Sequence, residues 1–165
     1  PSTDLYWRSP DAVTWEQFEG PDEGNLYDLA IGDDGTYVGV GALADTFLPA
    51  IWRAEELGTW ERVYEVASSK ETEERLQLAA AGGPGYLAGG STSACPGQTE
   101  RYCPSAAILA SADGREWQAL GVEDGVPGPL HDTVPQAIAA NGATTAMVVW
   151  HEDRPVEVWM LPSGE

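Results

Sequence analysis

The sequence predicts an all-β fold made of repeated antiparallel units. Short runs of alternating apolar and polar residues are separated by turn residues along the 165-residue chain, which contains 19 glycines and 12 prolines. A short turn segment also recurs, at residues 9–15, 54–60 and 111–117. A repeat of this kind sets the architecture, so these segments divide the chain into units.

The recurring turn has Ser, Asp and Trp at its first, third and seventh positions. These positions hold Ser9, Asp11 and Trp15, then Trp60 in a middle copy where Ala and Glu replace Ser and Asp, then Ser111, Asp113 and Trp117. An Asp side chain accepts hydrogen bonds from backbone N–H groups of its own turn, and Trp buries a large apolar area between sheets. We expect these residues to stabilise the scaffold.

The expected strands form successive units within a single domain, residues 1–165. Residues 1–20 form a half unit, a hairpin across the first turn. Residues 21–66 form a full unit with strands at 26–31, 36–41, 50–53 and 59–66, and residues 67–121 form another at 76–81, 86–90, 106–110 and 116–120. Residues 122–165 form an incomplete unit with strands at 136–140, 144–150 and 156–161. Four antiparallel strands in about forty residues match one β-propeller blade.

The turn resembles the Asp-box of BNR-type β-propellers, a family that includes sialidases, sortilin-like receptors and several secreted glycoside hydrolases. The family pattern is Ser/Thr-x-Asp-x-Gly-x-Thr-Trp, and the turns in this chain are one position shorter. The resemblance covers nearly all of the chain through its repeat. It implies propeller blades with the Asp-box residues in structural roles, but no particular activity, because one scaffold hosts many functions.

About three blades are too few to close a propeller ring, and an open fan of sheets leaves faces exposed. We expect a piece of a longer propeller or a self-assembled one, with an open arc as the third alternative. The N-terminal hairpin supplies third and fourth strands, which could complete the last unit in a neighbouring copy. The chain begins at Pro1, so we expect a removed leader or a longer protein.

The charge excludes some partners. The chain has 27 acidic and 8 basic residues, a net charge of −19 at pH 7. Such a surface repels phosphate backbones and anionic membranes, so nucleic acid is not an expected partner. No apolar run is long enough for a membrane span. A protein or glycan ligand is expected, and the acidity itself is explained by solubility.

The two cysteines, Cys95 and Cys103, lie in a segment with Pro and Gly between them. A local disulfide is the expected arrangement, and it predicts an extracytoplasmic, secreted protein. The single lysine beside seven arginines, with the Ala and Gly bias, indicates a GC-rich bacterial genome, so the expected source is bacterial. A free buried pair is the alternative. A zinc site lacks further ligands with suitable spacing.

Candidate binding residues come from the loops opposite the Asp-box turns, because loops on one face of such a scaffold usually carry function. They are Phe47, Arg101, Tyr102, His131, Asp132, His151, Glu152, Asp153 and Arg154. Antiparallel pairing should bring the two histidines close together, where they could bind a divalent metal or act as acid and base. The alternative is a pair of solvated loop histidines.

The sequence therefore favours a non-catalytic extracytoplasmic binding or assembly module. The alternative is part of a secreted glycoside hydrolase or lyase with a metal or carboxylate site near His131 and His151. No catalytic residue is assigned, since the clustered arginines of a sialidase and the nucleophile motifs of other hydrolases are not evident. No cofactor is expected apart from a possible divalent metal.

Overall fold

The structure is a computed structural model that describes residues 4–66, 73–82, 85–93, 104–127, 130–141 and 144–161. These residues form thirteen strands in four antiparallel sheets, with one short 3-10 helix at Val122–Asp124. The all-β, antiparallel prediction is confirmed. No helix in the described ranges is long and apolar enough to cross a membrane.

Each sheet is a meander of strands that follow one another in the sequence. Sheet A contains β1 (Leu5–Arg8) and β2 (Glu16–Glu19). Sheet B contains β3 (Gly24–Ile31), β4 (Tyr37–Leu43), β5 (Pro49–Ala54) and β6 (Glu61–Glu65). Sheet C contains β7 (Glu73–Gly82), β8 (Gly85–Ser93), β9 (Pro104–Ser111) and β10 (Gln118–Ala119). Sheet D contains β11 (Thr133–Asn141), β12 (Thr144–His151) and β13 (Glu157–Leu161).

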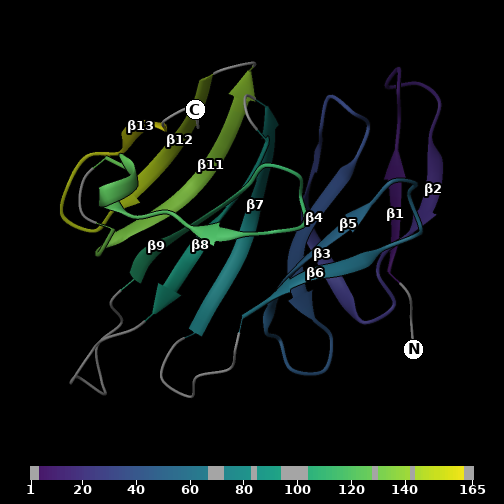
Figure 1. Cartoon of the computed structure of the whole chain (residues 1–165), viewed down its shortest axis with the longest axis horizontal. Helices are drawn as coiled ribbons and strands as arrows, with labels where there is room; N and C mark the ends of the chain where they lie inside the picture. The colour runs from purple at the N-terminus through teal and green to yellow at the C-terminus, as the bar shows by residue number, and fades with distance from the viewer. Residues whose placement is uncertain are drawn as a thin grey trace.

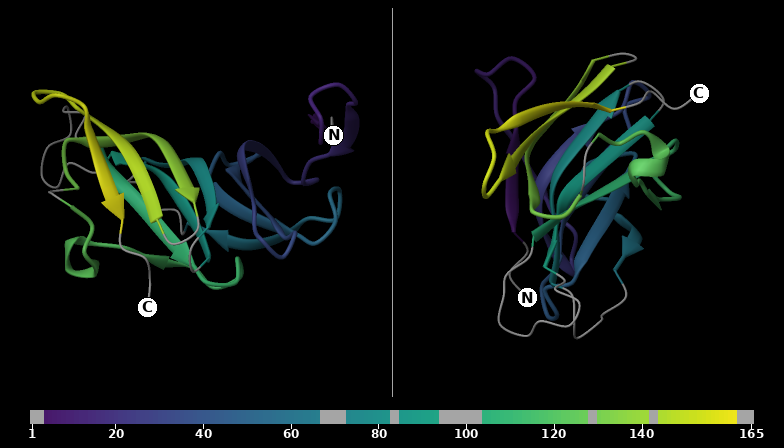
Figure 2. Two further views of the ribbon diagram at one scale, coloured as in Figure 1. Left: turned by 90° about the horizontal axis from the view of Figure 1, so that it is seen from above. Right: turned by 90° about the vertical axis from the view of Figure 1, so that its left-hand side faces the viewer.

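The four sheets follow one another in a row, with sheet A at one end and sheet D at the other (Figure 1; Figure 2). The first strands of sheets B, C and D are edge strands, and β7 contacts both β3 and β11. The chain therefore stacks consecutive meanders face to face, with their first strands side by side.

The core consists of three buried clusters: one surrounds Trp52 on the face of sheet B toward sheet A, and two lie between neighbouring larger sheets. Between sheets B and C, Ile51 and Val40 pack with Leu109. Between sheets C and D, Ile108 packs with Met147. Ile108 and Leu109 are consecutive, and successive side chains of a strand point to opposite faces. Sheet C is thus buried on both faces, which explains why β9 is almost entirely apolar.

A β-bulge recurs at the same place in the first strand of each larger sheet. The register shifts lie between Leu26 and Asp28, between Leu76 and Leu78, and between Pro135 and Ala137. Gly41 and Gly90 lie opposite the first two bulges, where an added Cβ would collide with the backbone carbonyls of Asn25 and Arg75. Glycine is required there because the bulged backbone approaches so closely.

The connections alternate between two ends of the sheets, as a meander requires. One end, the turn end, carries the recurring turns at residues 9–15, 54–60 and 111–117 and the β3–β4 hairpin. The opposite end, the loop end, carries residues 20–23, 44–48 and 152–156. The described strands differ from prediction at their ends: β7, β8 and β11 are each four residues longer than expected, and β10 has only two residues. Leu120, just after β10, still donates its N–H to the carbonyl oxygen of Ile108 (2.8 Å), and its side chain packs into the layer between sheets C and D.

Candidate functional site

Two of the recurring turns use the same hydrogen bonds. Oδ1 of Asp11 accepts the backbone N–H groups of Val13 (2.8 Å) and Thr14 (2.6 Å), and Ser9 donates to the same oxygen (3.1 Å). These bonds, chiefly those from the backbone of Thr14 and Val13, lower the pKa of Asp11 to about 2. The carboxylate therefore organises the turn and is not available as a proton donor near neutral pH.

The turn at residues 111–117 repeats this arrangement. Asp113 Oδ1 accepts the backbone N–H groups of Arg115 (2.8 Å) and Glu116 (3.2 Å), and these bonds lower its pKa. Ser111 adds a bond from its hydroxyl to the same oxygen and accepts the N–H of Gly114. The middle turn has no such carboxylate bond among its described contacts, and the backbone carbonyl of Glu56 accepts from Thr59 instead.

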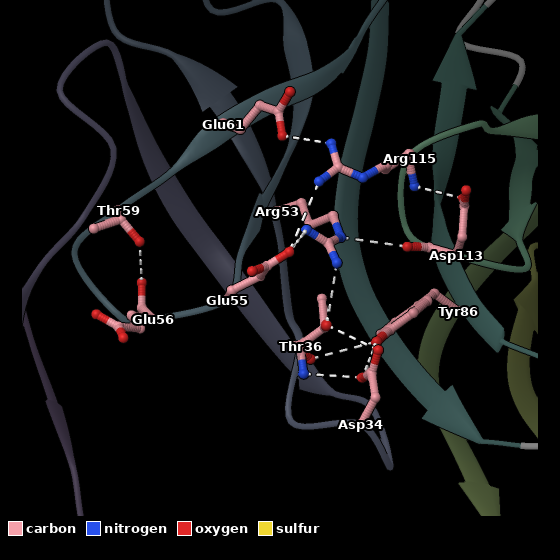
Figure 3. A network of polar contacts seen from close by, with 10 residues as sticks. All are labelled: Asp34, Thr36, Arg53, Glu55, Glu56, Thr59, Glu61, Tyr86, Asp113 and Arg115. Atoms are coloured by element: carbon pink, nitrogen blue, oxygen red, sulfur yellow. Dashed lines mark hydrogen bonds and ion pairs between the residues drawn. The ribbon is translucent and has the colours of Figure 1, made fainter.

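The turn after β9 also fastens sheet C to sheet B (Figure 3). Arg53 of β5 donates from Nε to the carbonyl oxygen of Asp113 (3.3 Å) and pairs through Nη1 with Glu55 (3.1 Å). Arg115 reaches back across the interface to Glu61 of β6 (2.7 Å). The side chain of Arg53 is only 11% exposed, whereas the side chains of Glu55, Arg115 and Glu61 are 73%, 46% and 59% exposed, so the ion pairs of this contact are open to water.

A second contact at the turn end joins the same two sheets. The hydroxyl of Tyr86 in β8 donates to Asp34 Oδ1 (3.1 Å), and Asp34 also accepts the N–H and hydroxyl of Thr36 (Figure 3). These bonds, chiefly that from the backbone of Thr36, lower the pKa of Asp34. Tyr86 is distant from Asp34 in the chain, so the sequence gives no signal of this contact.

The turn tryptophans differ in their surroundings. Trp117 packs against the layer between sheets B and C, and Trp60 donates from its indole to the carbonyl oxygen of Glu19 (2.9 Å). Trp15 is 57% exposed, because no described sheet lies beyond sheet A. The expectation that each turn Trp packs between sheets is therefore wrong for Trp15 in this chain.

At the loop end, Phe47 is an exposed aromatic residue among the predicted binding residues. It is 73% exposed and has φ of 59°, a left-handed conformation that bulky residues rarely adopt. The turn is closed by hydrogen bonds from the N–H of Phe47 to Leu43 and from the N–H of Leu43 to Leu48. Strained, exposed aromatic residues of this kind are candidates for ligand contact.

His151 is buried within sheet D, with its side chain 1% exposed. Nδ1 lies 3.1 Å from Thr133 Oγ1 and 3.0 Å from Arg154 Nη2. A guanidinium group can only donate, so Nδ1 accepts the hydrogen bond from Arg154. Nε2 lies 3.5 Å from Glu157 Oε2. Trp159 donates to the same carboxylate, and this bond is the main cause of its lowered pKa.

His131 is exposed, in contrast to His151, although both lie beside Thr133. His131 forms a β-bridge with Ser105, and its carbonyl oxygen accepts the hydroxyl of Thr133. Asp132, Glu152 and Asp153 are exposed. Within the described ranges, no group of three or more His, Cys, Asp or Glu side chains is placed to hold a metal ion. Pairing brings the two segments together as expected, but places the two imidazoles in different environments.

Four predicted residues cannot be placed. Arg101, Tyr102, Cys95 and Cys103 lie outside the described residues. Their binding role and the disulfide stay predictions.

The bulges identify further candidate residues that sequence reasoning missed. At each bulge, the extra residue that lies between two cross-strand pairs is exposed. These residues are Tyr27, Gln77 and Gln136, and we name them the bulge row. Their strands are the neighbouring edge strands of sheets B, C and D. The glycines opposite the first two bulges were the available signal, since Gly41 and Gly90 hold equivalent positions of the repeat.

Comparison with protein-family models, with curated proteins and with solved structures finds no match to this chain. The resemblance to Asp-box repeats therefore rests on the turns themselves.

Proposed function

We propose that this chain is a non-catalytic binding module built from β-propeller blades, and that it binds a neutral glycan near the loop end. Consecutive four-stranded meanders that pack face to face, with their first strands side by side, support a propeller-type arrangement. The Asp-centred turns at the other end support the Asp-box resemblance. They serve the scaffold, so ligand binding is assigned away from them.

The bulge row is the observation that carries this proposal. Asp28, which follows Tyr27, accepts the N–H of Ala79 in the neighbouring strand (2.8 Å). Ala79 lies two residues after Gln77, so Tyr27 and Gln77 lie at similar levels of their strands. Sheet D continues the row, because β11 packs beside β7 and carries Gln136 at its own bulge.

The side chains of the bulge row suit a sugar. A tyrosine ring offers an apolar face with a polar tip, and the amide of Gln77 offers a donor and an acceptor for hydroxyl groups. The amide nitrogen of Gln136 donates to the carbonyl oxygens of Val134 (3.5 Å) and Pro135 (3.3 Å), so this residue offers its side-chain oxygen as an acceptor. Phe47 adds an exposed ring at the same end of sheet B. The net charge of −19 repels acidic glycans, so the ligand is expected to be neutral.

An array of neutral and acidic oligosaccharides tests the proposal. The wild-type chain should bind neutral members, and Tyr27→Ala should weaken that binding by roughly tenfold or more, as loss of an aromatic anchor does. Ile31→Ala is the matched control, because Ile31 lies on the same strand, is 57% exposed and is near the turn end. Equal losses in the two variants, or no neutral glycan bound by the wild type, would contradict the proposal.

The hydrolase or lyase alternative stays a prediction without a supporting contact. The described partners of His151 are Arg154, Thr133 and Glu157, and the Glu157 carboxylate is already held by Trp159. An extracytoplasmic location likewise stays a prediction, because it depends on the two cysteines.

A further inference from the structure

Each sheet in the middle of the row has one face toward the sheet before it and one toward the sheet after it. Ile51 in sheet B and Ile108 in sheet C hold the same position of the repeat, and each is buried by the sheet that follows. Val158 holds this position in sheet D and is 63% exposed. The outer face of sheet D thus has the position of a buried interface but no described covering sheet.

This outer face is continuous and apolar. Cross-strand pairing places its members on one side of the sheet: Val148 lies opposite Val158 and Ala137, and Ala146 lies opposite Met160 and Ala139. Trp150, two residues after Val148, extends the same side and is 41% exposed. We name this set the D-face: Ala137, Ala139, Ala146, Val148, Trp150, Val158 and Met160. None of these residues is charged, in a chain of net charge −19, and such patches usually mark an interaction surface.

The other end of the row carries a second exposed apolar face on sheet A. Tyr6 and Arg8 point toward sheet B, where they contact Leu26 and Tyr37. The alternate residues Leu5 and Trp7 face away and are 54% and 58% exposed. Trp15 is also exposed, and together these three residues are named the A-face.

The A-face has the residues that, in sheet B, contact the preceding sheet of the row. Trp52 of sheet B, which holds the position of Trp7, is fully buried on the side that faces sheet A. Trp60, which holds the position of Trp15, bonds to sheet A. The A-face therefore corresponds to the side of a sheet that contacts the preceding sheet in the row. The D-face corresponds to the side that contacts the following sheet.

We propose that the D-face of one copy of this chain packs against the A-face of a second copy. In the interfaces between sheets A and B, B and C, and C and D, a face of the D-face type meets a face of the A-face type, so contact between copies would continue an interface that the fold already uses. The contact is heterologous, which leads to a ring or an open row. It rests on the repeat arrangement in the proposed function, and not on the glycan site. Because both copies carry the same large negative charge, salt should strengthen the association.

Light scattering and sedimentation across concentration and salt test this inference. The wild type should form dimers or larger species, and more of them at high salt. Val158→Glu on the D-face and Trp7→Glu on the A-face should each be monomeric, because a charge placed in an apolar interface is costly. Mixing the two variants should restore a species of two chains only, since one retains an intact A-face and the other an intact D-face.

The control is Ile31→Glu, which adds the same charge at an exposed apolar residue of sheet B, away from both faces and from the bulge row, and should associate as the wild type does. A monomeric wild type at every concentration and salt would overturn the inference. A Trp7→Glu variant that still dimerises, beside a monomeric Val158→Glu, would also overturn it, because that result indicates contact between two D-faces. Glycan binding measured on Val158→Glu separates the two proposals, since loss of association alone leaves the glycan site intact.

Discussion

The Tyr86 hydroxyl donates a hydrogen bond to Asp34 Oδ1 across the interface between sheets B and C, over 3.1 Å. Asp34 also holds Thr36, so one carboxylate both shapes the β3–β4 turn and anchors the next sheet. The equivalent tyrosine of sheet B, Tyr37, accepts from Arg8 of sheet A (3.1 Å) in a more exposed setting. A tyrosine at one repeat position thus joins sheet B to sheet A and sheet C to sheet B.

Tyr86→Phe should lower the free energy of unfolding by about 0.5–1.5 kcal/mol, the usual net value of an intramolecular hydrogen bond. Tyr86 is 5% exposed, so water cannot fully replace the lost bond. Tyr37→Phe is the matched control and should cost less, because Arg8 is exposed to solvent. Urea unfolding measures both changes. Equal losses of unfolding free energy in the two variants would contradict the prediction that the buried bond between Tyr86 and Asp34 contributes more than the exposed bond between Tyr37 and Arg8.

The Asp turns should make the fold sensitive to acid. The folded-state pKa values of Asp11, Asp34 and Asp113 lie below the ordinary value of 3.8, so folding favours their charged forms. Their contribution is fully present above pH about 4 and is lost as the pH falls through the folded-state values. Asp113→Asn should therefore show a smaller fall in Tm between neutral and acidic solution than the wild type. If Asp113→Asn shows the same pH dependence of Tm as the wild type, protonation of Asp113 does not contribute to the acid sensitivity of the fold.

Two adjacent glycines in β8 should differ in their tolerance of a side chain. An added Cβ at Gly90 collides with the carbonyl oxygen of Arg75, whereas at Gly89 the closest atom is Met147 Cε at 3.4 Å. Gly90→Ala should cost about 1–3 kcal/mol, as overpacking does. Gly89→Ala should change stability by less than about 1 kcal/mol. Thermal unfolding of the two variants measures the difference, and similar Tm values would contradict the bulge geometry described for β7.

Phe47 should be dispensable for stability. Its left-handed backbone favours glycine, so Phe47→Gly should leave Tm unchanged or raise it slightly, while Phe47→Val should lower it because β-branched residues fit this conformation poorly. Calorimetry of the two variants gives the order. A lower Tm for the glycine variant than for the valine variant would show that the φ of Phe47 does not limit stability.

Local turn chemistry explains why much of the fold could be predicted. Asp11 and Asp113 make bonds within their own turns, so their partners are only two or three residues away in the sequence. The alternating strands between such turns pair with their neighbours along the chain, and all four sheets are meanders for this reason. The candidate binding site was harder to predict from the sequence. Phe47 was identified from its loop, but Tyr27 and Gln77 look like ordinary strand residues until the register shift is seen.

The sequence by itself determined the repeat, the antiparallel sheets and the residues that organise the turns, because these features depend on contacts between near neighbours. Tertiary structure alone decided which faces of the sheets meet, that His151 is buried while His131 is exposed, and that Trp52 is covered while Trp7 is exposed. The two tryptophans hold the same position of the repeat. Only their place in the row differs, and burial depends on whether a neighbouring sheet is present.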